Sequence, residues 1–200
     1  MVNGLQDQLY ELFGEVIYDI STTDLLYYLN LAQTQIIKEK VQVFEQTQYI
    51  TDELRTLLKE EDITPVELSD RFIAQLPADY KILIKHKCTA SDEECGTKTV
   101  PGVLVQNDDI YQLLKDPFWK PIAREPLYYI FGDQIVYENP DSSFILSNVN
   151  ISYIKEEAKI NISLVDETID QDSELPLFIH DEIVSIAKNL VIRDKQLNNN

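Results

Sequence analysis

The chain has 200 residues, 44% of them apolar, which fits one domain with a sizeable core. Its 35 acidic and 17 basic residues give a net charge of -18, which argues against nonspecific binding to nucleic acid or to an anionic membrane. No apolar run reaches transmembrane length, and residues 1–13 lack the basic flank and apolar core of a signal peptide. The charge therefore indicates either solubility alone or a surface that lies near nucleic acid without sticking to it.

A long amphipathic helix is predicted over Thr22–Gln48, with Thr22 or Thr23 as N-cap and Asp24 in the first turn. Apolar residues recur at three-, four- and seven-residue steps, and a second apolar stripe lies about a quarter-turn away. The main stripe is Leu25, Leu29, Ala32, Ile36 and Val43; the second is Leu26, Ile37 and Phe44. A face this broad predicts neighbours on two sides within the chain, or one neighbour in this chain and one in another chain.

Further helices are predicted on both sides of the chain's centre. The ranges are Leu5–Ile17, residues 51–58, residues 66–76 and a closing helix that begins near Pro176. The closing helix places Ile179, Ile183, Ile186 and Leu190 on one face. Glu60–Asp62 is predicted to be a solvated break.

The central region changes to strand patterns after Pro77. Residues 80–88 alternate, with Ile82, Ile84, His86 and Cys88 on one face, and residues 97–106 are the predicted antiparallel partner across an acidic loop. Further strands are predicted at Leu127–Phe131, Gln134–Glu138 and Phe144–Ile154, with a turn at Gly132–Asp133 and a short helix at Asp108–Leu114.

The predicted fold class is α+β. Long amphipathic N-terminal helices and a closing C-terminal helix form a helical bundle, and a central antiparallel β-rich stretch is inserted into it. All 200 residues belong to one domain, with a helical part at 1–76 and 175–194 and a β-rich insertion at 77–165.

Three states of Cys88 and Cys95 are compatible with the sequence: a metal site with His86, a disulfide within the hairpin, or two ordinary thiols. We favour the thiols, because a structural zinc site needs four closely spaced ligands and His180 lies far away in a helical pattern.

Motifs for catalysis are missing from the sequence: it has no glycine-rich phosphate loop, no G-x-S-x-G turn and no H-E-x-x-H. We therefore expect no enzyme activity, no cofactor and no resident metal. Paired aromatic residues indicate either ordinary packing in and around the core or protein contacts, because exposed aromatic and arginine side chains often anchor interfaces. The predicted interface residues are Leu26, Ile37, Phe44, Phe118, Trp119 and Arg124.

Six segments, in this order, resemble the head-to-tail connector (ring or adaptor) proteins of tailed bacteriophages, most closely those of crAss-like phages. The segments are LNLAQ at 29–33, TDELR at 51–55, LPADY at 76–80, DPFWKP at 116–121, SYIK at 152–155 and LPLFIHDEIV at 175–184. The resemblance covers roughly residues 22–193, excludes residues 88–95, and carries no catalytic residue.

This resemblance implies a structural subunit of the virion at the head-to-tail junction. Copies would form a ring, a dodecamer by that resemblance, between the portal protein and other connector or tail proteins. The genomic DNA would pass through the ring without specific binding. The β-rich stretch and the loop Ser91–Gly96 would reach these partners by adding strands to a sheet edge. The alternative is a phage assembly chaperone, or another acidic interaction module, that is absent from the finished particle.

Overall fold

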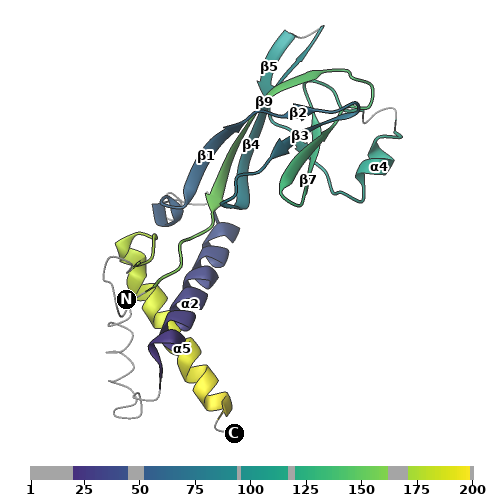
Figure 1. Cartoon of the computed structure of the whole chain (residues 1–200). Helices are drawn as coiled ribbons and strands as arrows, with labels where there is room; N and C mark the ends of the chain where they lie inside the picture. Colours follow the sequence, from purple (N-terminus) through teal and green to yellow (C-terminus); the bar gives the residue numbers. More distant parts are fainter. Residues whose placement is uncertain (1–19, 45–51, 94–95, 117–119, 162–170, 199–200) are drawn as a thin grey trace. The chain divides into compact units, whose positions relative to one another are not determined.

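The computed structural model describes residues 20–44, 52–93, 96–116, 120–161 and 171–198. The chain divides into two compact units, one made of residues 1–57 and 157–200 and the other of residues 58–156 (Figure 1). The elements in chain order are α2 (Thr22–Gln42), β1 (Leu58–Ile63), β2 (Val66–Glu67), β3 (Arg71–Gln75), β4 (Tyr80–Asp92), β5 (Gly96–Val100), β6 (Val103–Leu104), α4 (Ile110–Leu113), β7 (Leu127–Phe131), β8 (Gln134–Glu138), β9 (Ile145–Lys155) and α5 (Leu177–Asn198).

The first unit is built on α2 and α5, which pack against each other (Figure 1). Ser21, rather than Thr22 or Thr23, is the N-cap of α2, and it forms a capping box with Asp24. The predicted main stripe is confirmed at Leu25, Leu29, Ala32 and Ile36, which are buried. The buried face of α5 contains Ile179, Ile183, Val184, Ala187 and Val191.

The predicted helical bundle is wrong, although the chain does combine helices with strands. Residues 52–54 form one helical turn, and strand begins at Leu58. The segment expected to be a break and a further helix forms β1, β2 and β3. β2 pairs locally with β3, whereas β1 pairs with β9 and β3 with β8, which lie far away in sequence. In β3 the buried residues Phe72 and Ala74 alternate with less buried ones, as expected for a strand. A segment of five residues is too short for its sequence pattern to distinguish a strand from a helix. The predicted helix Leu5–Ile17 lies outside the described residues.

The second unit contains two sheets. The first, which we call sheet A, has the order β1-β9-β4-β5 and is antiparallel throughout; the second, sheet B, has the order β2-β3-β8-β7-β6. The predicted strands β7 and β8 are confirmed residue for residue, with Gly132 in the turn at a φ of +60°. The predicted partner strand 97–106 divides at Pro101–Gly102: β5 continues sheet A, whereas β6 pairs in parallel with β7 in sheet B.

Irregular pairing between β4 and β9 changes which side chains of β4 face the core. The register shifts between Leu83 and Lys85, so that Ile84 is an extra residue in the ladder. Leu83, and not the predicted Ile82 and Ile84, therefore packs on the same core as the buried Cys88.

A buried polar cluster around His86 lies between the two sheets. The Gly102 amide donates to His86 Nδ1 at 3.3 Å, so Nε2 carries the proton and donates to the Tyr137 hydroxyl. The His86 ring also stacks on Tyr128, with 4.2 Å between ring centroids. His86 belongs to sheet A and both tyrosines belong to sheet B, so this cluster, which we call the histidine cluster, joins the two sheets.

Gly102→Ala tests how closely the histidine cluster is packed. An added Cβ would lie 2.6 Å from His86 Cε1 and 2.8 Å from Tyr128 Cδ1, both in rings that have little room to move. We expect a loss of roughly 1–3 kcal/mol in the free energy of unfolding, measured by urea denaturation. Lys87→Ala, at an exposed position of β4, is the control. Equal stability of the two variants would contradict this packing.

Acid should weaken the second unit through His86. Burial lowers the pKa of His86 from 6.5 to about 4, so between these values the unfolded chain binds a proton that the folded chain does not. The contribution of neutral His86 to the free energy of unfolding is complete above pH 6.5. It is lost as the pH falls towards 4, and the loss is roughly 3 kcal/mol at most. Denaturation curves between pH 4 and 7 should show this slope, His86→Gln should remove it, and His180→Gln should keep it.

Candidate interaction surfaces

The described members of the predicted interface are divided between the two units: Leu26, Ile37 and Phe44 belong to the first and Arg124 to the second. Ile37 is completely buried within the first unit, so its side chain is not available to a neighbouring subunit in this conformation. Leu26 and Phe44 are half-buried, and Arg124 is exposed on the turn that precedes β7. Phe118 and Trp119 lie outside the described residues.

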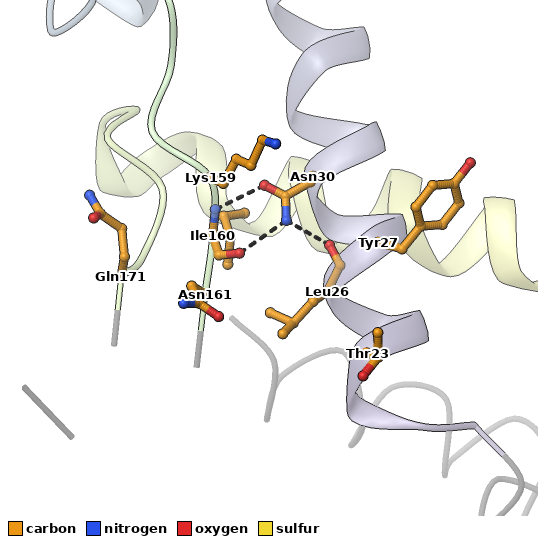
Figure 2. Close-up of a pocket in the computed structure, with 8 residues that line it drawn as sticks. All are labelled: Thr23, Leu26, Tyr27, Asn30, Lys159, Ile160, Asn161 and Gln171. Atoms are coloured by element: carbon orange, nitrogen blue, oxygen red, sulfur yellow. Dashed lines mark hydrogen bonds between the residues drawn. The ribbon is translucent and has the colours of Figure 1, made fainter. Parts of the chain in front are cut away.

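The polar side chains of α2 bind an extended segment of the same unit, residues 157–161, which the sequence analysis missed (Figure 2). The side-chain amide of Asn30 pairs with both backbone groups of Ile160, as the backbone of an adjacent strand would. Its Nδ2 donates to the Ile160 carbonyl at 3.0 Å, and its Oδ1 accepts from the Ile160 amide at 2.9 Å. Gln33 Nε2 donates to the Ala158 carbonyl at 3.0 Å, and Thr34 donates to Glu157 at 3.0 Å. We call these contacts the amide ladder. An Asn and a Gln three residues apart on one helix face were the only signal for it.

A pocket of about 420 Å³ lies beside the amide ladder. Its lining is Thr23, Leu26, Tyr27, Asn30, Lys159, Ile160, Asn161 and Gln171 (Figure 2). The Asn30 amide already binds Ile160 and the Leu26 carbonyl, so its hydrogen-bonding capacity serves the fold. Among the described residues, the lining holds one cationic side chain and no histidine, cysteine or carboxylate, which gives these residues little capacity for acid–base or nucleophilic chemistry.

A buried ion pair ties α2 to the helical turn at 52–54. Lys40 Nζ lies 3.0 Å from Glu53 Oε1 and 3.5 Å from Glu182 Oε2, and Glu53 is 1% exposed. Burial acts to lower the pKa of Lys40, but the hydrogen bond to Glu53 and the charge of Glu182 outweigh it and raise that pKa. The lysine therefore stays charged and stabilises a carboxylate that would be costly to bury alone.

The strongest candidate for protein contacts is the pair of open edges of sheet A. Strand β1 pairs only with β9 and strand β5 only with β4 among the described residues, so each has one side without a partner strand. All residues of β1 except Ile63, and all of β5 except Val100, are exposed. An exposed strand edge presents unpaired backbone N–H and C=O groups, which is a template for adding another strand.

The β1 edge is held in place by side chains from its neighbours. The Tyr153 hydroxyl donates to Asp79 at 2.9 Å and to Glu61 at 3.3 Å, and Lys59 forms an ion pair with Asp79. The hydrogen bond from Lys59 holds the pKa of Asp79 below its usual value. Asp62 accepts from the side-chain amides of Asn148 and Asn150, which likewise lower its pKa. The edge is thus ordered before any partner binds.

Cys88 is not part of a disulfide in the described part of the chain. Cys88 is a free, buried thiol whose pKa burial raises to about 12, and its Sγ donates to the Val100 carbonyl at 3.6 Å. Among the described residues, no group of three histidine, cysteine or carboxylate side chains is placed to hold a metal ion. No helix in that part of the chain is both long and apolar enough to span a bilayer. Cys95 lies outside the described residues.

Asn30→Ala tests the amide ladder. Loss of both hydrogen bonds to Ile160 should release residues 157–161 from α2, and amide exchange at Ile160 should accelerate by about tenfold or more, measured by hydrogen–deuterium exchange. Asn148→Ala removes an amide of the second unit and should leave this segment unchanged. Unaltered exchange at Ile160 in Asn30→Ala would mean that other contacts hold the segment.

No protein-family model and no curated protein matches this chain. The features of this chain that bear on function are therefore its own residues and contacts. In the described part of the chain, they provide open strand edges at β1 and β5, a pocket beside α2 and a buried histidine cluster.

Proposed function

We propose that this chain is a structural subunit of a tailed-phage particle. It forms a ring at the head-to-tail junction, joins the portal protein to the tail and surrounds the DNA channel without catalysis. The six segments that resemble connector proteins of crAss-like phages support this proposal, and they cover both described units.

The observation that carries the proposal is the presence of two different open edges on one sheet. Because β1 and β5 are at opposite sides of sheet A, one copy can contact two neighbours through two different surfaces. Such head-to-tail contacts close into rings when the rotation between subunits allows it. A self-complementary contact, by comparison, ends at a dimer.

Charge supports the same function. A net charge of -18 lets the protein lie beside DNA without gripping it, since tight binding to phosphates needs lysine and arginine. A channel that passes a genome during packaging and ejection requires this lack of adhesion.

Two buried titratable groups with shifted pKa values also favour a structural role. His86 and Tyr137 have pKa values moved by burial, but both side chains lie in the core, with Tyr137 fully buried and His86 8% exposed. A substrate would have no access to them in this conformation. Their arrangement fits the joining of two sheets better than proton transfer.

Cross-linking mass spectrometry of purified phage particles tests the proposal, with the exposed Lys38, Lys87 and Lys159 as reactive sites. We expect cross-links from this chain to itself and to the portal protein. Particles dissociated before cross-linking are the control and should lose the links to the portal. Absence of the chain from mature particles would overturn the connector function and favour the assembly chaperone.

A further inference from the structure

We propose that β5 of one copy pairs with β1 of the next copy, so that sheet A continues from subunit to subunit around the ring. This inference rests on the proposed ring assembly. Strand directions alternate along the order β1-β9-β4-β5, and β1 and β5 therefore run in opposite directions. Placing a second copy beside the first in the same orientation brings β5 against β1 as an antiparallel pair.

The buried partners of each edge strand determine which side chains meet. Lys98 pairs with the buried Ala90, and Glu61 pairs with the buried Ile151, so both belong to the core-facing side of sheet A. Both side chains are nevertheless exposed, because β1 and β5 are the two edge strands of sheet A. Keeping the same faces together allows Lys98 to lie directly opposite Glu61, with opposite charges facing each other.

The other positions of this register are also compatible. On the outer face Thr97 lies opposite Asp62, and Thr99 lies opposite Glu60, so each hydroxyl is a donor beside a carboxylate. A shift of two residues would place Lys98 opposite Lys59 or Ile63 and lose the charge pair. The five residues of β5 then match five of the six in β1.

Pairing of like edges is less favourable. Two β1 strands related by a two-fold axis bring together six carboxylates and two lysines. Only the register that places Glu60 opposite Glu60 sets Lys59 opposite Glu61, and the register centred on Glu61 places Glu61 opposite Glu61 without such pairs. Two β5 strands centred on Lys98 place the lysines opposite each other. Like charges directly opposite destabilise a strand pair, so the charges favour β5 with β1.

The offset between the two edges suits a closed assembly. β5 and β1 lie at opposite ends of the β4–β9 pair (Figure 1), and the positions of Lys98 and Glu61 project onto Ala90 and His86 of β4. The offset from His86 to Ala90 is four residues, or about 14 Å along the strands, and the four strands of one copy span about 19 Å across the sheet. Successive copies would therefore be displaced along the strands, so that the strands are inclined to the axis of the assembly by roughly 35–40°. Closed sheets tilt their strands by a similar angle, roughly 35–45°.

Cysteine trapping tests the pairing in a Cys95→Ser background, on the purified chain at high concentration and on phage particles that carry the variants. Glu61→Cys and Lys98→Cys together should give a ladder of disulfide-linked multimers on non-reducing gels, because directly opposite residues in a strand pair are close enough to bridge. Each single substitution should give monomers. A double variant with Lys87→Cys in place of Lys98→Cys, on the same sheet but away from its edges, is the control.

The outcomes separate this inference from the proposed function. No ladder from the double variant in either sample would overturn the pairing, even if the chain is present in particles. Dimers from Glu61→Cys alone would indicate β1 with β1 and would also overturn it. A ladder from the purified chain, with no chain in particles, would support the pairing and remove the connector function.

Charge reversal provides a second readout that does not need disulfides. Glu61→Lys or Lys98→Glu alone should weaken self-association about tenfold, measured by analytical ultracentrifugation, and the two together should restore it. Glu67→Lys, at the edge of sheet B, should have no effect. Normal association of both single variants, with unchanged melting temperature, would overturn the register.

Discussion

Closure of the two sheets depends on the close approach of Gly102 to the His86 ring. The chain leaves sheet A after β5 and enters sheet B at β6, and Gly102 lies at this crossing. The space that a side chain would need there is occupied by His86 and Tyr128. Only a residue without Cβ allows the crossing, the hydrogen bond to Nδ1 and the stacking on Tyr128 together.

The same crossing explains why sheet A has an open edge at β5. Since the chain turns away at Pro101 to join sheet B, no following segment of the described chain continues sheet A beyond β5. At the opposite edge, β1 carries Glu60, Glu61 and Asp62 on consecutive residues. Consecutive charges are a common way to prevent two identical edges from aggregating, and they still permit a partner strand of opposite charge. The internal packing of the second unit and its proposed assembly are thus connected.

Local sequence patterns predicted the elements whose stability is mainly local. The α2 stripe, the short helix near residue 110 and the β7–β8 hairpin with its glycine turn all follow from periodicity and turn chemistry within about twenty residues. The polar first strand did not follow from its sequence, because Leu58–Ile63 is stabilised by pairing with Ile154–Val149, almost ninety positions later. The amide ladder was missed for a similar reason: Asn30 and Ile160 meet only in the folded chain.

The sequence by itself determined that the protein is acidic, that a long amphipathic helix and a closing helix frame a strand-rich centre, and where the central hairpin turns. These properties depend on composition and on the spacing of neighbouring residues, which folding does not change. The tertiary structure alone decided that residues 58–75 form strands, that Ile37 is internal and that Leu83 replaces Ile82 and Ile84 on the core. It also decided which edges of sheet A remain open. Each of these depends on strand pairing or burial between distant segments, where non-local contacts outweigh local preference.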